Sequence, residues 1–386
     1  MNNQQNSELD PEITGVDSNE VTFIKIYDSC TSSTPEFNPD LTHQVFPDEV
    51  IKGHTNPRID IYYNGSTLDC YYAFSSDAQE KDCTDVDKHI ANLLSPPGQQ
   101  QPLLTTSLSH FESTFTSETS PLFTHTETIG DYYHEGVTYC INRCNLSSSP
   151  AIWPLHRRIE SLMFLFIDEF GRIDLEEPGW TSFYVLKKIS SSNYSLVGSM
   201  TAYSFFAYPD STRLRLSQVF ILPPFRGIGL AKKLVSSLYM TAVEVGAKDV
   251  LPESPGDSIV SVLDLFHCQL FRDFGVKLSD FENETYINKE KLLDICRKTA
   301  LNYDLALRAC EFFRFVSLQQ KGLLEEDCVE FVKFRRDVKK RYYSNNVSSL
   351  LAMEVGEQKE KLDEMFTADL ETYKNLLPGL ERIMVD

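Results

Sequence analysis

Short stretches of alternating hydrophobic and polar residues dominate the start of the sequence. Residues 21–27, 59–63 and 68–74 alternate and are rich in β-branched and aromatic side chains, which predicts strands. Asn64-Gly65, between the second and third stretches, is a strong signal for a hairpin turn. Residues 1–20 are polar and acidic without periodicity, so we expect a disordered tail that ends at Val21.

The pattern changes in the middle of the chain. Residues 95–130 are rich in Ser, Thr, Gln and Pro, which predicts loops. A strand is expected at 137–141, and apolar residues at helical spacing from Leu155 to Phe170 predict a helix. The elements expected next are strands at 182–189, 195–208 and 213–222, a glycine loop, a helix at 230–242, a strand at 248–251 and a helix at 258–271.

Beyond Asn288 the sequence is helical in character, with few glycines or prolines. The order of elements predicts an α+β fold: an N-terminal α/β domain, a central mixed sheet and a helical C-terminal domain. Within the helical part, Lys333, Arg335, Arg336, Lys339, Lys340 and Arg341 form a basic cluster. This cluster has two interpretations: a nuclear import signal or phosphate-contacting face, and a solvated helix surface, which we favour.

Length and charge limit the function classes. The 386 residues are enough for two or three domains. The chain carries 36 Lys and Arg against 56 Asp and Glu, a net charge of −20, and residues 1–150 hold 22 of the acidic but only 6 of the basic residues. Because phosphate backbones are bound by clustered positive charge, a general nucleic-acid binder is disfavoured and a basic partner fits better.

The nine cysteines are expected to be free thiols in a reducing intracellular compartment, because the start of the chain lacks the features of a secretory signal. Cys140 and Cys144 form the only close pair, which we interpret as buried thiols on a strand rather than as a zinc site. The longest apolar stretch, 162–167, is too short to span a bilayer.

The strongest local feature is Arg226-Gly227-Ile228-Gly229-Leu230-Ala231, between an apolar strand and an apolar-striped helix. Two glycines let the backbone curl around an anion, and the first amides of the helix point at it, so a phosphate or pyrophosphate is the natural ligand. The loop is neither a P-loop nor a dinucleotide fingerprint. A tight strand-to-helix turn without a ligand is the alternative.

The R-x-x-G-x-A pattern in this loop, the strand before it and the helix after it resemble the pyrophosphate loop of the GNAT acetyltransferases, which bind acetyl-coenzyme A (acetyl-CoA). Longer segments carry a more specific resemblance: residues 42–49, 173–180, 208–210, 217–229, 252–255 and 334–341. Together they resemble the catalytic subunits of type B histone acetyltransferases. The resemblance implies a central GNAT fold and four segments: a disordered acidic tail (1–20), a domain contributing to histone-tail binding (21–135), the acetyl-CoA-binding core (136–272) and a C-terminal helical domain (273–386).

The resemblance also implies catalytic residues. A lysine amine with a pKa of about 10.4 must lose a proton before it attacks a thioester, and Glu253 falls where the family has its general base. Asp168 takes the place of a second carboxylate on the helix before the central sheet, where the family has Glu. Ser254 replaces an acidic residue after the base. From the residues alone, the preferred interpretation of Glu253 is a turn residue beside a helix N-terminus.

Coenzyme contacts are implied for Val219, Phe220, Ile221, Arg226, Gly227, Ile228, Gly229, Leu230, Ala231, Lys232 and Ser258. The backbone of Val219 and Ile221 would bind the pantetheine arm, and residues 226–232 the pyrophosphate. Ser258 also suits the first turn of its helix as a capping group. Histone-tail contacts are implied for Asp48, Glu49, Trp180, Tyr203, Ser204 and Phe205. Core packing is the alternative for Trp180 and Phe205, and simple solvation for the acidic pair.

The activity implied is direct transfer of an acetyl group from acetyl-CoA to lysines in the N-terminal tail of free histone H4, without a metal or an acyl-enzyme. A WD-repeat histone-binding subunit, and histone H3 together with H4, are implied partners. The implied location is cytoplasm and nucleus, with no nucleic-acid or membrane partner. Two alternatives stay open: a GNAT enzyme acting on another amine, such as a protein N-terminus or a polyamine, and a histone-binding module with weak or no catalysis.

Overall fold

The computed structural model describes residues 15–95, 105, 107–115 and 120–384. The chain divides into two compact units. The first unit comprises Met1–Thr201 with Gln218–Leu230, and the second comprises Ala202–Ser217 with Ala231–Asp386. The two units are defined by packing and do not coincide with the four segments expected from the sequence. The division into four segments stays a prediction. Most of the predicted tail lies outside the described residues, but regular structure begins at Gly15, before Val21.

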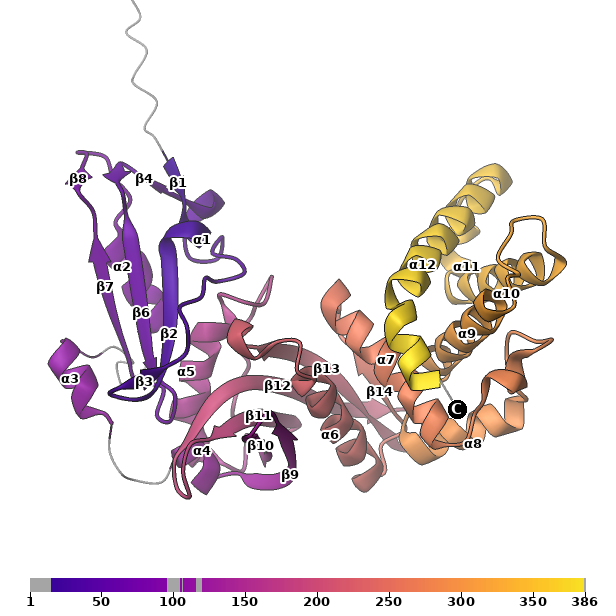
Figure 1. Cartoon of the computed structure of the whole chain (residues 1–386), viewed down its shortest axis with the longest axis horizontal. Helices are drawn as coiled ribbons and strands as arrows, with labels where there is room; N and C mark the ends of the chain where they lie inside the picture. Colours follow the sequence, from indigo (N-terminus) through magenta and orange to yellow (C-terminus); the bar gives the residue numbers. More distant parts are fainter. Residues whose placement is uncertain (1–14, 96–104, 106, 116–119, 385–386) are drawn as a thin grey trace, which may run out of the picture. The chain divides into compact units, whose positions relative to one another are not determined.

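The first unit begins with a four-stranded sheet of order β3-β2-β6-β7 (Figure 1). The elements are β1 (Gly15–Asp17), α1 (Ser18–Val21), β2 (Thr22–Ser29), β3 (Ser32–Ser33), a 3-10 turn (Pro47–Glu49), β4 (Val50–Lys52), β5 (His54–Thr55), β6 (Arg58–Asn64), β7 (Cys70–Ser75), β8 (Ala78–Gln79), α2 (Val86–Leu94), α3 (Leu108–Ser113) and α4 (Pro121–Thr124). Alternate residues of β2 are buried, as its pattern predicts. Strands β6 and β7 are antiparallel, which confirms the hairpin at Asn64-Gly65.

A six-stranded mixed sheet follows, with the order β14-β13-β12-β11-β10-β9. Its elements are β9 (Glu127–His134), β10 (Val137–Asn145), a 3-10 turn (Pro150–Ile152), α5 (Trp153–Met163), β11 (Trp180–Lys188), β12 (Tyr194–Ala207), β13 (Ser211–Ile221), a 3-10 turn (Pro223–Phe225), α6 (Leu230–Glu244), β14 (Asp249–Pro252) and α7 (Asp257–Asp273). Strand β10 is antiparallel to β9 and β11, and β13 is parallel to β14. Strands β12 and β13 contribute residues to both units. The predicted strands and both helices around the glycine loop are confirmed.

Two expectations in this region were wrong. Strand β9 lies within and beyond a segment predicted as loops, because most of its side chains are exposed or half-buried and leave no hydrophobic alternation. Helix α5 ends at Met163 instead of continuing to Phe170, and turns follow it. Those turns bury Leu165, Phe166 and Phe170. The spacing of these apolar residues in the sequence is helical, although their backbone is not.

The rest of the second unit is helical, as predicted. It contains a 3-10 turn (Leu278–Phe281), α8 (Lys289–Thr299), α9 (Tyr303–Gln320), α10 (Val329–Asn345), α11 (Val347–Leu350) and α12 (Val355–Met384). Asn288 and Asn302 cap the N-termini of α8 and α9 by accepting backbone N–H bonds. Helix α9 is buried on nearly every side, including Glu311 and Arg314, so its charged side chains need partners inside the protein.

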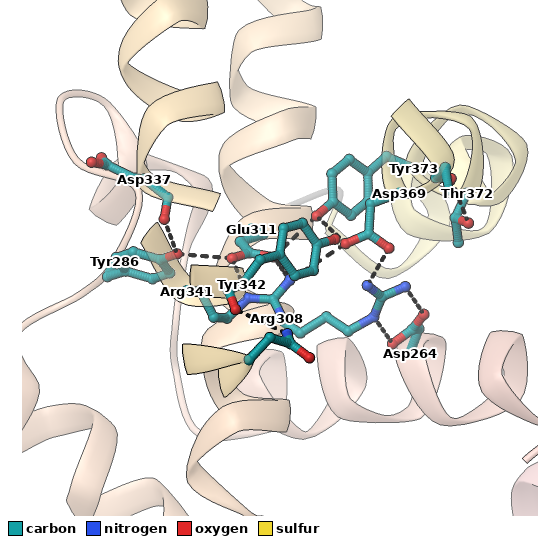
Figure 2. Close-up of polar contacts among 12 residues, drawn as sticks. Asp264, Tyr286, Arg308, Glu311, Asp337, Arg341, Tyr342, Asp369, Thr372 and Tyr373 are labelled. Carbon is teal, nitrogen blue, oxygen red and sulfur yellow. Dashed lines mark hydrogen bonds and ion pairs between the residues drawn. The ribbon is translucent and has the colours of Figure 1, made fainter. Parts of the chain in front are cut away.

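A buried network of charges supplies those partners for α9 (Figure 2). Arg308 donates two hydrogen bonds to Asp264 of α7, at 2.9 and 3.0 Å, and one to Asp369 of α12, at 2.6 Å. Arg341 of α10 donates two bonds of 2.7 Å to Glu311. The hydroxyls of Tyr286 and Tyr373 also donate to Glu311, at 2.8 and 3.0 Å (Figure 2). The network therefore joins α7 to three helices of the C-terminal part.

None of the nine cysteines forms a disulfide, and Cys140 and Cys144 are buried on β10 as expected. Among the described residues, no group of three or more His, Cys, Asp or Glu side chains could hold a metal ion. Within the same residues, no helix has the length and hydropathy needed to cross a membrane.

Candidate active site

The glycine loop joins the end of β13 to α6, as the sequence predicts. Gly227 and Gly229 have φ angles of +79° and +89°, a left-handed conformation that only glycine adopts without strain. The loop leads directly into the first turn of α6, whose backbone N–H groups have no carbonyl partner within the helix. This geometry suits an anion at the start of α6.

Two residues that the sequence did not single out hold this loop. Asp40 binds the guanidinium group of Arg226 through both oxygens, at 3.0 and 2.7 Å. The Nε atom of Arg226 donates to the carbonyl of Ile221 at 2.9 Å. The hydroxyl of Tyr132, on the unpredicted strand β9, donates to the carbonyl of Ile228 at 2.8 Å. Arg226 is therefore held against the end of β13 by an acidic residue far away in the sequence.

The other residues expected to contact coenzyme lie on either side of the loop. Val219, Phe220 and Ile221 form the end of β13, and Phe220 and Ile221 are buried. Leu230, Ala231 and Lys232 form the first turn of α6, where burial is the main cause that lowers the pKa of Lys232. In the second unit, Ser258 is exposed on the first turn of α7 but does not cap it, because Gly256 is the N-cap residue.

Glu253 lies at the end of β14, and two side chains from β13 hold its carboxylate. The hydroxyl of Ser217 donates to Oε2 at 2.8 Å, and Nη1 of Arg215 lies 3.0 Å from Oε1. The backbone N–H of Glu253 donates to the carbonyl of Leu216 at 2.9 Å. With 39% of its side chain exposed, Glu253 is both oriented by the protein and accessible from solvent.

Arg215 also connects this carboxylate to residues predicted to bind substrate. Its guanidinium carbon lies 5.9 Å from the ring centre of Tyr203 and 5.8 Å from that of Phe205, both half-buried on β12 beside Ser204. These distances are within cation–π range. Arg215 and Ser217 are two residues apart on β13, so their side chains lie on the same face of the strand. This spacing could have identified both in the sequence as candidate site residues.

A second cluster of predicted residues lies in the first unit and is centred on His43. The Nε2 atom of His43 lies 3.0 Å from Oδ1 of Asp168, and Nδ1 lies 3.6 Å from Oε1 of Glu49. The same oxygen of Glu49 accepts the backbone N–H groups of Thr42, at 2.8 Å, and His43, at 3.2 Å. The bond from Thr42 is the main cause that lowers the pKa of Glu49. Glu49 is thus partly occupied by its own loop, whereas neighbouring Asp48 is exposed.

The placement of Asp168 needs revision, and the surroundings of Trp180 favour the core-packing alternative. Asp168 lies in a turn after α5, not on a helix, because α5 ends at Met163. Trp180 begins β11 and is buried, with its indole N–H donating to Glu177 at 3.3 Å, so packing occupies most of the ring. Asp168 belongs to the first unit and Glu253 to the second.

Left-handed backbone conformations recur beside the acidic residues of both clusters. Asp48 and Glu49 have φ angles of 56° and 57°, Glu169 after Asp168 has 51°, and Ser254 after Glu253 has 39°. Non-glycine residues adopt this region at a cost of about 1–3 kcal/mol, and such residues concentrate at functional sites. Strained residues therefore accompany the carboxylates that the sequence singled out, as well as four other positions: Asn56, Leu68, Glu135 and Ala300.

Comparisons with known proteins agree with this arrangement. Residues 14–168 match the family model described as "Histone acetyl transferase HAT1 N-terminus". The human "Histone acetyltransferase type B catalytic subunit" is 26% identical over 399 residues, covering 94% of this chain and 91% of the relative. The protein of the same name from Kluyveromyces lactis is 25% identical over 389 residues, with 96% and 93% covered.

Solved structures of acetyltransferases align with smaller parts of the chain. An aminoglycoside acetyltransferase from a soil metagenomic sample, in complex with sisomicin, is 18% identical, with 32% of this chain and 82% of that chain covered and a TM-score of 0.25. Arabidopsis thaliana NAA60 in complex with a bisubstrate analogue is 14% identical, with 32% and 81% covered and a TM-score of 0.23.

The mixed sheet, the glycine loop before α6 and the relatives that match nearly the full length of the chain all indicate an acetyltransferase. Its α+β fold with a helical C-terminal part is the one that the sequence predicted. More particularly, over nearly its full length the chain is similar to the catalytic subunits of type B histone acetyltransferases, which confirms the resemblance seen in the sequence.

Proposed function

We propose that this chain transfers the acetyl group of acetyl-CoA to lysine side chains in the N-terminal tail of free histone H4, with Glu253 as general base. The observation that carries the proposal is the carboxylate of Glu253, fixed by Ser217 and Arg215 at the end of β14 and accessible to solvent. Histone acetyltransferases among the relatives support the substrate class.

Glu253 would act on the incoming amine. A lysine amine is protonated at neutral pH, and its attack on a thioester requires a base within hydrogen-bond reach. Ser217 and Arg215 fix both carboxylate oxygens, which leaves their remaining lone pairs to receive the proton directly or through a water molecule. The family resemblance also supports an assisting role for Asp168, whose Oδ1 lies 3.0 Å from His43.

A direct attack fits the cysteines better than an acyl-enzyme does. Cys268, on α7, is the cysteine nearest in sequence to the glycine loop and to Glu253. It is fully buried, and burial raises its pKa well above the ordinary value of a thiol, so it forms little thiolate.

The loop supplies the features that a coenzyme pyrophosphate requires. Gly227 and Gly229 open the backbone, the first amides of α6 offer donors, and Arg226, paired with Asp40, lies at the start of the loop. The backbone of Val219 and Ile221 would bind the pantetheine arm, with Phe220, Ile228, Leu230, Ala231, Lys232 and Ser258 as further contacts. Acetyl-CoA brings the activated thioester to this site.

The acidic N-terminal part suits a basic histone tail. Asp48 is exposed, and the lowered pKa of Glu49 keeps that side chain ionised at neutral pH. Opposite charges accelerate the encounter of substrate and enzyme and make it sensitive to salt. The family resemblance further supports a WD-repeat histone-binding subunit as partner, H3 bound together with H4, and action in both cytoplasm and nucleus.

The test is acetyl transfer by the purified full-length chain, with labelled acetyl-CoA and a panel of amines. The panel comprises H4 and H3 tail peptides, a lysine-free peptide with a free N-terminus, and spermidine. We expect the H4 peptide to be labelled at its lysines. Preferential labelling of the free N-terminus or of spermidine would instead support a different amine substrate, and coenzyme binding without any transfer would indicate a histone-binding module.

The base is tested with Glu253→Gln, which keeps the shape of the side chain and removes its charge. We expect kcat to fall by about 10²–10⁴-fold, the usual contribution of a general base, with unchanged coenzyme affinity by calorimetry. Glu364→Gln, at an exposed position of α12, is the matched control and should retain full activity. Full kcat in Glu253→Gln across the pH range would exclude this base.

A further inference from the structure

An open groove of about 660 Å³ lies between α10 and α12, within the second unit. Its lining residues are Val332, Arg335, Arg336, Lys339, Lys340, Tyr343 and Ser344 of α10 and Leu362 of α12. Four cationic side chains therefore converge on one groove in a chain whose net charge is −20. Neither acetyl transfer nor binding of a basic histone tail explains this concentration of positive charge.

The structure separates the basic cluster seen in the sequence into bound and available cations. Arg341 is largely buried and pairs with Glu311 in the network of Figure 2. Lys333 binds Glu284 and the carbonyl of Asn283 and does not line the groove. These two cations have structural roles, so the cluster is not a uniform solvated face.

The four cations in the groove are less completely neutralised. Arg335 and Lys339 share the carboxylate of Asp363 on α12. Arg336 and Lys340 are 62% and 68% exposed. The Nε atom of Arg336 lies 3.9 Å from Oδ1 of Asp337, and Nζ of Lys340 lies 3.5 Å from the same oxygen. Asp337 also accepts a hydrogen bond from Thr285. The groove thus keeps an excess of positive charge that a ligand can reach.

Apolar side chains flank these cations. Val332 is 49% exposed at one end and Tyr343 is 38% exposed at the other, while Leu362 lines the α12 side. Val332, Arg336, Lys340 and Tyr343 recur every three or four residues and so share one face of α10. The opposite face of α10 is buried through Phe331, Phe334, Val338 and Tyr342. The available face therefore presents cations between two apolar ends.

We propose that the α10–α12 groove binds an acidic peptide segment that also carries apolar side chains. Acidic side chains would pair with Arg336 and Lys340, and apolar ones would cover Val332 and Tyr343. A nucleic acid or a polyphosphate would satisfy the cations but leave the apolar ends exposed, and its higher charge density would be repelled more strongly by the acidic chain. The basic histone tail is excluded from this groove by its charge.

The experiment measures fluorescence anisotropy of a labelled peptide with the full-length chain. The probe has about 14 residues, roughly 21 Å as a helix, with Glu and Asp in the centre and Leu toward both ends. A second probe replaces each acidic residue by its amide, and a short polyphosphate and a single-stranded oligonucleotide serve as competitors. Binding is expected for the acidic probe, with weakening as salt is raised, and not for the amide probe.

Matched variants locate the site. Arg336→Glu combined with Lys340→Glu should raise the Kd of the acidic probe by about tenfold or more, because like charges would then face each other. Lys359→Glu combined with Lys374→Glu changes the net charge equally at exposed α12 positions outside the groove and should change Kd by less than about twofold. Tyr343→Ala should weaken binding by several-fold through loss of apolar contact.

Three results would overturn the proposal. The first is absence of binding by the acidic probe, and the second is equal weakening by the two charge-reversal pairs. The third is tighter binding of polyphosphate or oligonucleotide that Tyr343→Ala leaves unchanged, which would assign the groove to phosphates. Acetyl transfer to the H4 peptide, measured on the same preparations, should be unchanged in all variants and confirms that each is folded.

Discussion

The imidazole of His43 lies between two acidic side chains, with Nε2 3.0 Å from Asp168 and Nδ1 3.6 Å from Glu49. It thereby connects the loop of residues 42–49 to the turn after α5. The side chain of Asp168 is 73% exposed, and besides this contact its Oδ1 accepts the backbone N–H of Glu169 at 2.8 Å. Exposed ion pairs contribute little to stability, and we therefore assign His43 a positioning role.

Replacement of His43 tests this role. We expect His43→Ala to lower kcat/KM for the H4 peptide by up to about fivefold, the equivalent of an exposed ion pair of about 0.2–1 kcal/mol. His43→Gln can still donate a hydrogen bond to Asp168 and should recover part of the loss. Steady-state kinetics with both variants decide the matter, and identical kcat/KM in His43→Ala and the parent would contradict the positioning role.

Gly229 should be required for coenzyme binding. An added Cβ atom would lie 3.6 Å from the hydroxyl of Tyr132, which is ordinary contact, so Gly229→Ala introduces backbone strain without a clash. A left-handed alanine costs about 1–2 kcal/mol, and relief of that strain would displace the loop amides. We expect an approximately tenfold weaker affinity for coenzyme A by calorimetry.

Gly246 provides the control for this experiment. Its φ of +67° is also left-handed, it follows α6, and a Cβ atom there would meet nothing within 4 Å. Gly246→Ala should destabilise the fold to a similar extent and leave coenzyme affinity intact. If both substitutions weakened coenzyme binding equally, general destabilisation rather than the loop would be responsible.

Stability should depend on pH through two buried histidines, one in each unit. His156 and His267 are fully buried beside the hydroxyls of Tyr184 and Tyr239, at 3.0 and 2.7 Å. Burial lowers the pKa of each from 6.5 to about 3. Between these values the unfolded chain binds a proton that the folded chain does not, so the free energy of unfolding falls as pH falls below 6.5.

Each histidine should account for a loss of about 1.4 kcal/mol between neutral pH and about pH 5.5. Urea unfolding followed by circular dichroism at both pH values measures this loss, in a range above the titration of ordinary carboxylates. His267→Gln retains a hydrogen-bonding group for Tyr239. It should remove the part of the pH-dependent loss in unfolding free energy that His267 causes. An unchanged dependence in that variant would show that other groups cause it.

The buried network predicts a large cost for loss of Arg308. Arg308→Met leaves the carboxylates of Asp264 and Asp369 without this partner in a buried environment, and we expect a loss of about 3–5 kcal/mol in unfolding free energy. Arg297→Met, at a position of α8 whose side chain is 76% exposed, should change stability by less than about 0.5 kcal/mol. Urea midpoints compare the two, and similar midpoints would show that the network is dispensable.

The sequence predicted the regular elements well wherever packing imposed a period. The alternation of β2 and the apolar stripe of α6, with Leu234 and Leu238 buried, follow directly from burial on one face. Strand β9 was not predicted because all of its side chains are exposed or half-buried. The end of α5 was missed because Phe166 and Phe170, which are buried in turns, have the spacing of apolar residues on one face of a helix.

The candidate site was predicted unevenly for a related reason. Glu253 and the loop glycines carry local signals in sequence, whereas their supports come from distant segments. Arg226 meets Asp40, 186 residues away, and Glu253 meets Ser217, 36 residues away. Only the pairing of strands and loops in three dimensions brings such residues together, and a single sequence contains no record of that pairing.

The order of synthesis gives the ion pairs of Arg308 a further significance. Asp264 is made 44 residues before Arg308, and Asp369 is made 61 residues after it. On the ribosome, α7 therefore emerges with Asp264 before Arg308 has been made. Arg308 in turn lacks its second partner until Asp369 of α12 has been made. A premature stop codon between α9 and α12 would spare every residue proposed for catalysis, yet leave a buried arginine with only half of its counter-charge. Sequences cut short in this way should be recognised by cellular quality control as unfinished proteins.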